Sequence, residues 1–121
     1  MPPPLTNGRR RLVLCADDYA LTPGVSEGIV ALAQAGRLSA VSCMTASRFW
    51  PEHAGALRAL DGRIDIGLHV TLTDQRPLGP MLRTAPDGRL PSLAGTLARG
   101  LAGRLDQAEI AAEIDRQLAA F

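Results

Sequence analysis

Residues 12–27, LVLCADDYALTPGVSE, constrain the fold more than any other part of this chain. The first four residues of this stretch are all apolar, which is typical of a strand covered on both faces in a parallel sheet flanked by helices. Two acids, Asp17 and Asp18, follow the strand without a basic neighbour. Ligand sites in parallel α/β sheets lie beyond the carboxyl ends of the strands. The acidic pair therefore predicts a functional site at that edge.

The alternative for Asp17 and Asp18 is a helix cap or a turn, because Asp is common in both. Thr22 and Pro23 already provide a cap and a first-turn residue a little further along. Extended geometry sends neighbouring side chains to opposite faces, so both carboxylates can face one site only if the backbone departs from the strand there. We then expect one carboxylate to ligate a cation and the other to handle a proton.

Composition limits the classes of function. A chain of 121 residues forms one domain or part of one, and 46% hydrophobic residues fit a globular α/β protein. A net charge of +1 and 3% aromatic residues argue against nucleic acid and anionic membranes as partners. All 13 basic residues are Arg, and the absence of Lys excludes Schiff-base and P-loop chemistry.

The amino-terminal segment and the cysteines indicate the compartment. The opening MPPPLTNGRRR has no apolar stretch, so we expect neither a signal peptide nor a membrane span, and we predict a disordered tail over residues 1–10. Cys15 and Cys43 fall in expected buried strands, so we interpret them as inert thiols in a reducing compartment. The sequence therefore predicts a cytoplasmic protein.

Helix and strand signals alternate along the first half of the chain. A helix is predicted from Thr22 to a stop at Gly36, a strand over residues 38–45, and a second helix over residues 51–60 with an apolar stripe. We expect His53 in the second helix to face solvent and not to ligate a metal. Trp50 is a candidate for stacking on a sugar ring, with packing as the alternative. The second-helix stripe comprises Ala56, Leu57 and Leu60.

The third predicted strand, residues 64–72, alternates strictly between apolar and polar side chains. Such alternation suits a barrel or cleft in which the polar side chains face the lumen. His69 belongs to the polar set, near the carboxyl end. A structural histidine is the alternative, but the two acids expected at the same rim favour metal ligation by His69. The apolar set comprises Ile64, Ile66, Leu68, Val70 and Leu72, and the polar set Asp65, Gly67, His69 and Thr71.

The remainder of the chain contains a loop and two further helices. Residues 74–91 hold four prolines, and we interpret them as an active-site loop. A weak helix, interrupted by glycines, is expected over residues 92–105. The last helix begins at a capping-box-like pair, Asp106 and Glu109. Its predicted apolar face comprises Ile110, Ile114, Leu118 and Phe121.

Three motifs carry a family resemblance. The run CADDYALTPGVSEGI, the later GLHVTLTDQRPL and the PDGRLPS segment resemble the YdjC-like carbohydrate deacetylases, which include chito-oligosaccharide deacetylases and hopanoid-biosynthesis-associated members. The resemblance covers residues 11–121 and corresponds to the amino-terminal part of such proteins. It implies part of an irregular β/α barrel, here with three strand-plus-helix units. Two positions depart from the family pattern, Ala20 where Gly is usual and Ser26 where Asn is frequent; a left-handed backbone at Ala20 would cost about 1 kcal/mol.

The resemblance also implies chemistry. The family removes acetyl groups from N-acetylated sugars with a divalent cation, Mg²⁺ or Zn²⁺, held by the second Asp, this His and a His from a later strand. Carried over, Asp18 and His69 become metal ligands and Asp17 the general base. No histidine of this chain matches the third ligand. We therefore expect the 121-residue chain alone to be inactive as a deacetylase and to associate with itself through uncovered strand faces.

Two readings from other classes stay open at this point. A phosphoryl-accepting receiver domain has a similar length and Mg²⁺-binding acids after its first strand, but it needs an acceptor Asp that ends the third strand, where this chain has His69, and a Lys near the last strand, whereas this chain has no Lys. The other reading is an inactive half-barrel that folds without catalysing a reaction.

Overall fold

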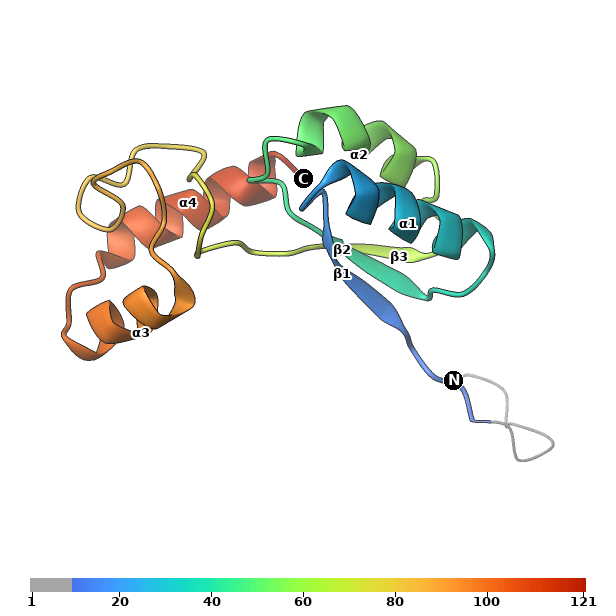
Figure 1. Cartoon of the computed structure of the whole chain (residues 1–121), viewed down its shortest axis with the longest axis horizontal. Coiled ribbons are helices and arrows are strands. Elements are labelled where there is room, and N and C mark those ends of the chain that lie inside the picture. The colour runs from blue at the N-terminus through green and yellow to red at the C-terminus, as the bar shows by residue number, and fades with distance from the viewer. Residues whose placement is uncertain (1–9) are drawn as a thin grey trace.

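The computed structural model of the chain describes residues 10–121 (Figure 1). The predicted disordered tail, apart from residue 10, lies outside the described residues. Strand and helix alternate up to the third strand, as predicted, so the α/β class is confirmed. The elements are β1 (Cys15–Tyr19), α1 (Pro23–Gln34), β2 (Ala40–Cys43), α2 (Trp50–Arg58), β3 (Asp65–Leu68), α3 (Leu93–Leu101) and α4 (Gln107–Ala119).

The three strands form one open parallel sheet in the order β1-β2-β3. Ala16 pairs with Val41 in the first ladder, and Val41 pairs with Ile66 in the second. This order places β2 in the centre. A receiver-type sheet has its first strand between the second and third. The topology therefore argues against the receiver alternative and agrees with strands that follow one another around an incomplete barrel.

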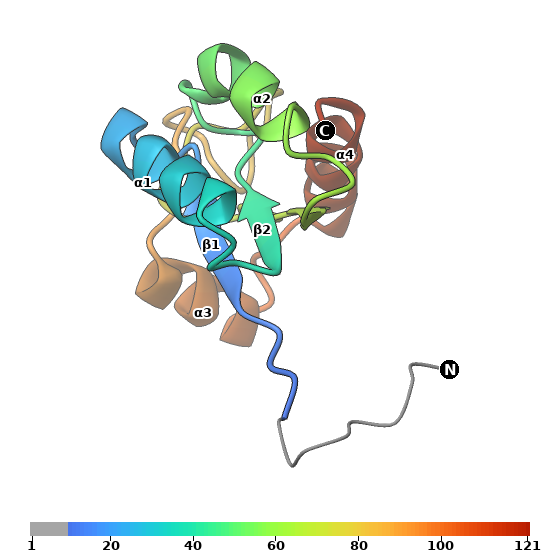
Figure 2. The same ribbon diagram turned by 90° about the vertical axis from the view of Figure 1, so that its right-hand side faces the viewer.

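Helices α1 and α2 cover one face of the sheet (Figures 1 and 2). Apolar side chains of the helices meet the inward side chains of the strands and form the main core. Burial of these side chains is the main stabilising contribution, at about 25 cal/mol per Å². The buried members are Tyr19, Ala20, Ile29, Ala33, Val41, Cys43, Trp50, Ala54, Leu57, Leu60 and Ile64.

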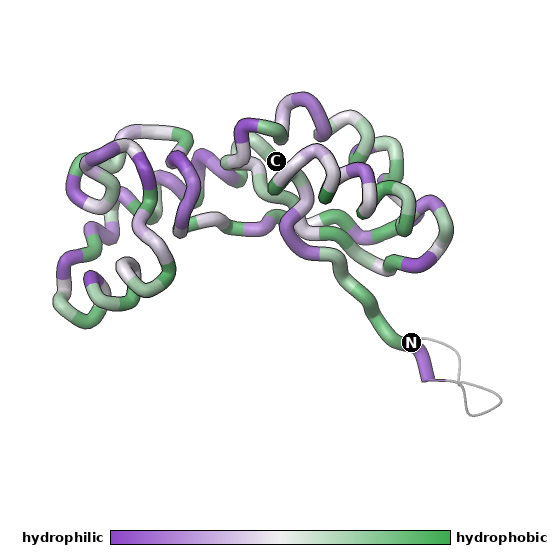
Figure 3. The backbone as a smooth tube through the Cα atoms, in the orientation of Figure 1, coloured by the Kyte–Doolittle hydropathy of each residue, from purple (hydrophilic) through white to green (hydrophobic). Residues whose placement is uncertain are grey.

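The prediction of a first strand buried on both faces is wrong. The strand begins only at Cys15, and Leu12 and Val13 are 84% and 80% exposed. Figure 3 shows this apolar segment running away from the body of the molecule towards the N label. Because α1 and α2 cover only one face, Cys15 is exposed as well, whereas Cys43 is buried as expected.

Helix α1 agrees with its sequence signals. The Thr22 hydroxyl accepts a hydrogen bond from the Val25 amide at 3.3 Å, and Pro23 is the first helical residue. Gly36 follows the helix with φ +68°, a left-handed conformation that glycine adopts without strain.

In α2, Leu57 is buried as predicted, but Ala56 is exposed and does not belong to the apolar stripe.

The predicted apolar face of the last helix forms only part of the packed face of α4, where Ile110 contacts the cluster of Met81, Ala85 and Leu90. Glu113 and Gln117 are fully buried, while Leu118 and Phe121 are 58% and 42% exposed. The reason is that α4 packs against the backbone of the long loop after β3, whose amides and carbonyls need polar partners. Asp106 does cap the helix, accepting from the Glu109 amide at 3.0 Å, but the Glu109 carboxylate bonds to the loop and not back to Asp106.

Residues 74–91 form a loop without helix or strand, as predicted. Its two ends are held together by hydrogen bonds from the Asp74 amide to the Pro91 carbonyl, 3.0 Å, and from the Leu90 amide to the Gln75 carbonyl, 2.8 Å. Within the loop a second small core contains Met81, Ala85 and Leu90. Among residues 10–121, no helix combines the length and apolar character that a membrane crossing requires.

Candidate active site

Asp17 and Asp18 lie within β1 at a distortion of the strand. Three steps along β1, from Ala16 to Tyr19, match two steps along β2, so one extra residue is inserted. Asp18 takes up the insertion with φ +61°, in the left-handed region that Asp tolerates better than most residues. This confirms that the backbone leaves regular strand geometry at the acidic pair, and it brings both carboxylates to one site.

A second left-handed residue follows at Ala20, with φ +73°. Ser26, on the first turn of α1, supports this conformation, because its buried hydroxyl accepts from the Ala20 amide at 3.1 Å and donates to the Thr22 carbonyl at 3.2 Å. The residue at position 20 therefore needs the backbone that glycine adopts most readily, and Ser26 stabilises that backbone from the helix. Ala20 and Ser26, the two positions that depart from the family pattern, are therefore joined by a hydrogen bond.

His69 follows the last residue of β3 and completes the cluster. Its amide donates to the Cys43 carbonyl at 2.9 Å, which continues the ladder with β2 by one residue. Nδ1 of His69 lies 2.8 Å from Oδ1 of Asp17 and 3.2 Å from Oδ1 of Asp18. Ionised carboxylates only accept hydrogen bonds, so Nδ1 carries the hydrogen in this arrangement. The polar set of the third strand thus reaches the acids of the first, as predicted.

The capping alternative for the two acids does not hold, because Thr22 caps α1.

The predicted third strand is shorter than expected: β3 ends at Leu68, and Val70 is 42% exposed. Beyond His69 the chain no longer pairs with the sheet, and Val70 is not part of the core beneath the helices.

The electrostatics of the cluster favour ionised Asp17. The Ser42 hydroxyl on the central strand donates to the same carboxylate oxygen that His69 contacts. This hydrogen bond is the largest cause of a lowered pKa of the Asp17 carboxyl; desolvation opposes it, and the attraction to His69 and the hydrogen bond with His69 add to the lowering. The Asp17 side chain is 68% exposed and that of His69 25%, so both are accessible from solvent. Sequence reasoning missed Ser42, although its alternation with the buried Val41 and Cys43 places it on the open face of β2.

The donor set fits a divalent cation. One ligand atom each from Asp17, Asp18 and His69 lies within 4.8 Å of the others. Carboxylate oxygens suit Mg²⁺ and imidazole nitrogen suits Zn²⁺, so this combination accommodates either ion.

Trp50 and His53 lie away from this cluster, on α2. Trp50 is 6% exposed, and its indole N–H donates to the Ala120 carbonyl at 2.9 Å, which supports the packing alternative over sugar stacking. His53 does not face solvent as expected. Its ring packs edge-on against Tyr19 with 6.5 Å between centroids, and Nε2 is buried.

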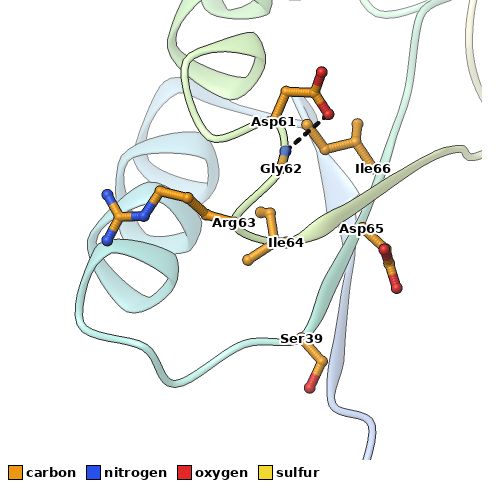
Figure 4. Close-up of a pocket in the computed structure, with 7 residues that line it drawn as sticks. All are labelled: Ser39, Asp61, Gly62, Arg63, Ile64, Asp65 and Ile66. Carbon is orange, nitrogen blue, oxygen red and sulfur yellow. Dashed lines mark hydrogen bonds between the residues drawn. The ribbon is translucent and has the colours of Figure 1, made fainter.

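Two surface cavities lie at opposite ends of the sheet. One of about 570 Å³ is formed around Ser39, Asp61 and Asp65, where β2 and β3 begin, so it is remote from the acids (Figure 4). Another, of about 650 Å³, is lined by residues that follow each of the three strands, including Leu21, Phe49 and Arg76. It lies at the carboxyl edge, where α/β proteins bind ligands, and is large enough for a sugar.

Comparison with known proteins settles the family. A family model described as YdjC-like protein matches residues 11–121. The chain belongs to the YdjC-like family. A carbohydrate deacetylase from Homo sapiens is 32% identical over 97% of this chain and 37% of its own length, and a chitooligosaccharide deacetylase from Serratia marcescens is 35% identical over 91% and 43%.

A solved structure shows the same fold. A proposed cellobiose-phosphate cleavage protein from Enterococcus faecalis aligns with a TM-score of 0.75 at 23% identity, covering 90% of this YdjC-like chain and 42% of that protein. The chain thus spans less than half of the length of each relative named here.

Proposed function

We propose that this chain carries the metal-binding and general-base residues of a carbohydrate deacetylase that acts on an N-acetylated sugar or oligosaccharide. The observation that carries the proposal is the convergence of Asp17, Asp18 and His69 at the carboxyl edge of the sheet. The names of the relatives support the substrate class.

The residues have distinct roles in the proposed reaction. Asp18 and His69 would hold a divalent cation, which supplies Lewis-acid polarisation of the acetamide carbonyl and lowers the pKa of water. Asp17 takes a proton from the attacking water as the C–O bond forms. Breaking of the C–N bond then releases acetate and the sugar amine, whose nitrogen gains a proton. An Asp carboxyl with the ordinary pKa of 3.8 is already ionised at neutral pH, so the lowered pKa of Asp17 keeps it ionised but makes it a weaker base.

Asp17 suits the role of base better than Asp18. Its side chain is 68% exposed against 48% for Asp18, so it is the more accessible of the two to water. The Ser42 hydroxyl fixes Oδ1 of Asp17 and leaves the second oxygen of that carboxylate to receive a proton.

A chimera tests the proposal. Residues 11–121 would replace the matching segment of the Serratia marcescens chitooligosaccharide deacetylase, and acetate release from an N-acetylated chito-oligosaccharide would be followed by NMR with Mg²⁺ or Zn²⁺. We expect cation-dependent acetate release from the chimera and none from the 121-residue chain. A folded chimera that binds the cation but releases no acetate would contradict the proposed reaction.

The alternative of an inactive half-barrel predicts that the chain folds and associates without catalysis in any context. Exposed apolar residues on α3, Leu93, Leu97 and Leu101, are compatible with association. Acetate release by the chimera argues against this alternative, because an inactive segment could not replace the active one.

A further inference from the structure

His69 lies where the sheet no longer fixes the chain. The last ladder pair is Cys43 with Leu68, and beyond the hydrogen bond from His69 to Cys43 the described residues 70–73 have no strand partner. A ligand must be held within about half an ångström to bind well. Some other group has to restrain the backbone after His69.

Gln117 of α4 provides this restraint although it lies 46 residues beyond Thr71 in the chain. Its side chain is fully buried. The Thr71 amide donates to Oε1 of Gln117 at 2.8 Å, and Nε2 of Gln117 donates to the Thr71 carbonyl at 2.7 Å. The side-chain amide thereby makes both hydrogen bonds that a neighbouring strand would make with this residue.

The orientation of the Gln117 amide is determined by its neighbour. Nε2 also donates to Oε1 of Glu113 at 3.0 Å, and a carboxylate only accepts, so the nitrogen must face Glu113. Glu113, itself fully buried, is paired with Arg116 at 2.9 Å and accepts from the Leu78 amide at 2.8 Å. The buried side chains of Glu113 and Gln117 therefore have hydrogen-bond partners in each other and in the chain after β3, which restrains both.

The restraint passes from Thr71 to His69. The Thr71 hydroxyl donates to the His69 carbonyl at 3.1 Å in a partly buried hydrogen bond, and Thr71 itself is buried. The Thr45 hydroxyl donates to the Gln117 carbonyl at 2.8 Å and ties this end of α4 to the segment that follows β2. The path from α4 to the site therefore consists of buried hydrogen bonds as far as Thr71 and a partly buried one from Thr71 to His69.

We propose that Gln117 is a positioning residue for His69. It acts through Thr71 to hold the imidazole against Asp17 and Asp18, so that the three side chains are arranged for a cation before it arrives. The proposal rests on the metal site of the proposed function. Glu109, two turns earlier on α4, holds the loop at Thr84 in the same manner, with 2.8 Å from the Thr84 amide, and makes no described contact with Thr71 or His69.

The test compares Gln117→Met with Glu109→Met. Both variants replace a polar side chain on the same helix by an unbranched apolar one and remove hydrogen bonds to the loop, so both should lower the melting temperature. With Mn²⁺ alone as the probe, measured by electron paramagnetic resonance, we expect Gln117→Met to weaken binding about tenfold, as typical for residues that orient a ligand. Glu109→Met should bind Mn²⁺ as the wild type does.

Two further measurements keep the result decisive. Thr71→Val removes only the hydroxyl that contacts His69 and keeps the shape of the side chain. It should also weaken Mn²⁺ binding, and it replaces Gln117→Met as the test if that variant fails to fold. The ¹⁵N spectrum of the His69 ring, recorded without metal, should change in Gln117→Met and Thr71→Val but not in Glu109→Met.

Two outcomes would overturn the proposal. One is a Mn²⁺ affinity equal to that of the wild type in both Gln117→Met and Thr71→Val; the other is an unchanged His69 ring spectrum in both variants. If the wild-type chain binds no Mn²⁺, the metal assignment fails, and the ring spectrum still decides whether Gln117 positions His69.

Discussion

Nδ1 of His69 lies 3.2 Å from Oδ1 of Asp18, although Asp18 belongs to β1, His69 follows β3, and β2 lies between these two strands. Asp18 has a left-handed backbone within β1, and His69 directly follows the last residue of β3. Ser42 on the central strand lies between them and donates to Asp17. Residues from all three strands therefore meet at one point of the carboxyl edge.

Removal of either proposed ligand should strongly weaken cation binding. Asp18→Ala and His69→Ala each leave too few protein ligands, so we expect Mn²⁺ affinity to fall by at least about a hundredfold, the upper range for the loss of an outer-shell partner. Asp65→Ala is the matched control, because Asp65 is an exposed acid at the opposite end of β3. Equal Mn²⁺ content in all four proteins would refute the ligand assignment.

Substitution of the proposed base should separate binding from catalysis. Asp17→Asn preserves the shape of the side chain but cannot take a proton, so in the chimera we expect acetate release to fall by about 10²–10⁴-fold. Cation binding, measured by isothermal titration calorimetry, should persist. Wild-type turnover in this variant would make Asp17 a structural residue.

The ionisation of Asp17 should depend on Ser42. The native pKa of Asp17 is lowered from an ordinary value of 3.8, so its ionised form stabilises the fold above that value, and this contribution is lost as the pH falls through the lower native pKa. Ser42→Ala removes the main cause and should raise the pKa of Asp17. A carboxyl ¹³C titration by NMR measures this shift directly; an unchanged midpoint would show that the Ser42 hydroxyl does not act on Asp17.

The left-handed turn at Ala20 predicts an unusual response to glycine. Ala20→Gly relieves roughly 1–2 kcal/mol of left-handed strain but removes a fully buried methyl group worth about 0.8 kcal/mol. We expect the free energy of unfolding in urea to change by less than about 1 kcal/mol. Ala33→Gly, a buried control inside α1, should destabilise the chain by about 2 kcal/mol, since it loses both helix propensity and a methyl group. Equal losses at the two positions would contradict the strain at Ala20.

The two cysteines should react at very different rates. Burial raises the pKa of the Cys43 thiol to about 11, so very little reactive thiolate is present at pH 8, and the side chain is out of reach of reagents. Cys15 is exposed. We expect a thiol reagent such as DTNB to label one cysteine rapidly in the native chain and the second only after unfolding, and mass spectrometry of peptides should identify the first as Cys15. Rapid labelling of both in the native chain would contradict the burial of Cys43.

The sequence by itself determined the α/β class, the strand and helix order up to β3, the caps of α1 and α4, and the acids and histidine of the site. These features depend on local patterns: Thr22 and Pro23 act within one turn of helix, and the alternation around His69 assigns its face without knowledge of any neighbour. The acidic pair also required a break in strand geometry, because two adjacent side chains cannot otherwise share a face.

Only the tertiary structure decided what each element packs against. The apolar run before Cys15 predicted burial, but α1 and α2 cover one face of the sheet and leave Leu12 and Val13 exposed. In the same way, the apolar face of α4 predicted its contact surface, yet the loop after β3 needs partners for its amides and carbonyls, so Glu113 and Gln117 are buried instead. No local pattern distinguishes a buried Gln from an exposed one, because burial of a polar side chain depends on hydrogen-bond partners that lie 46 residues away in the chain.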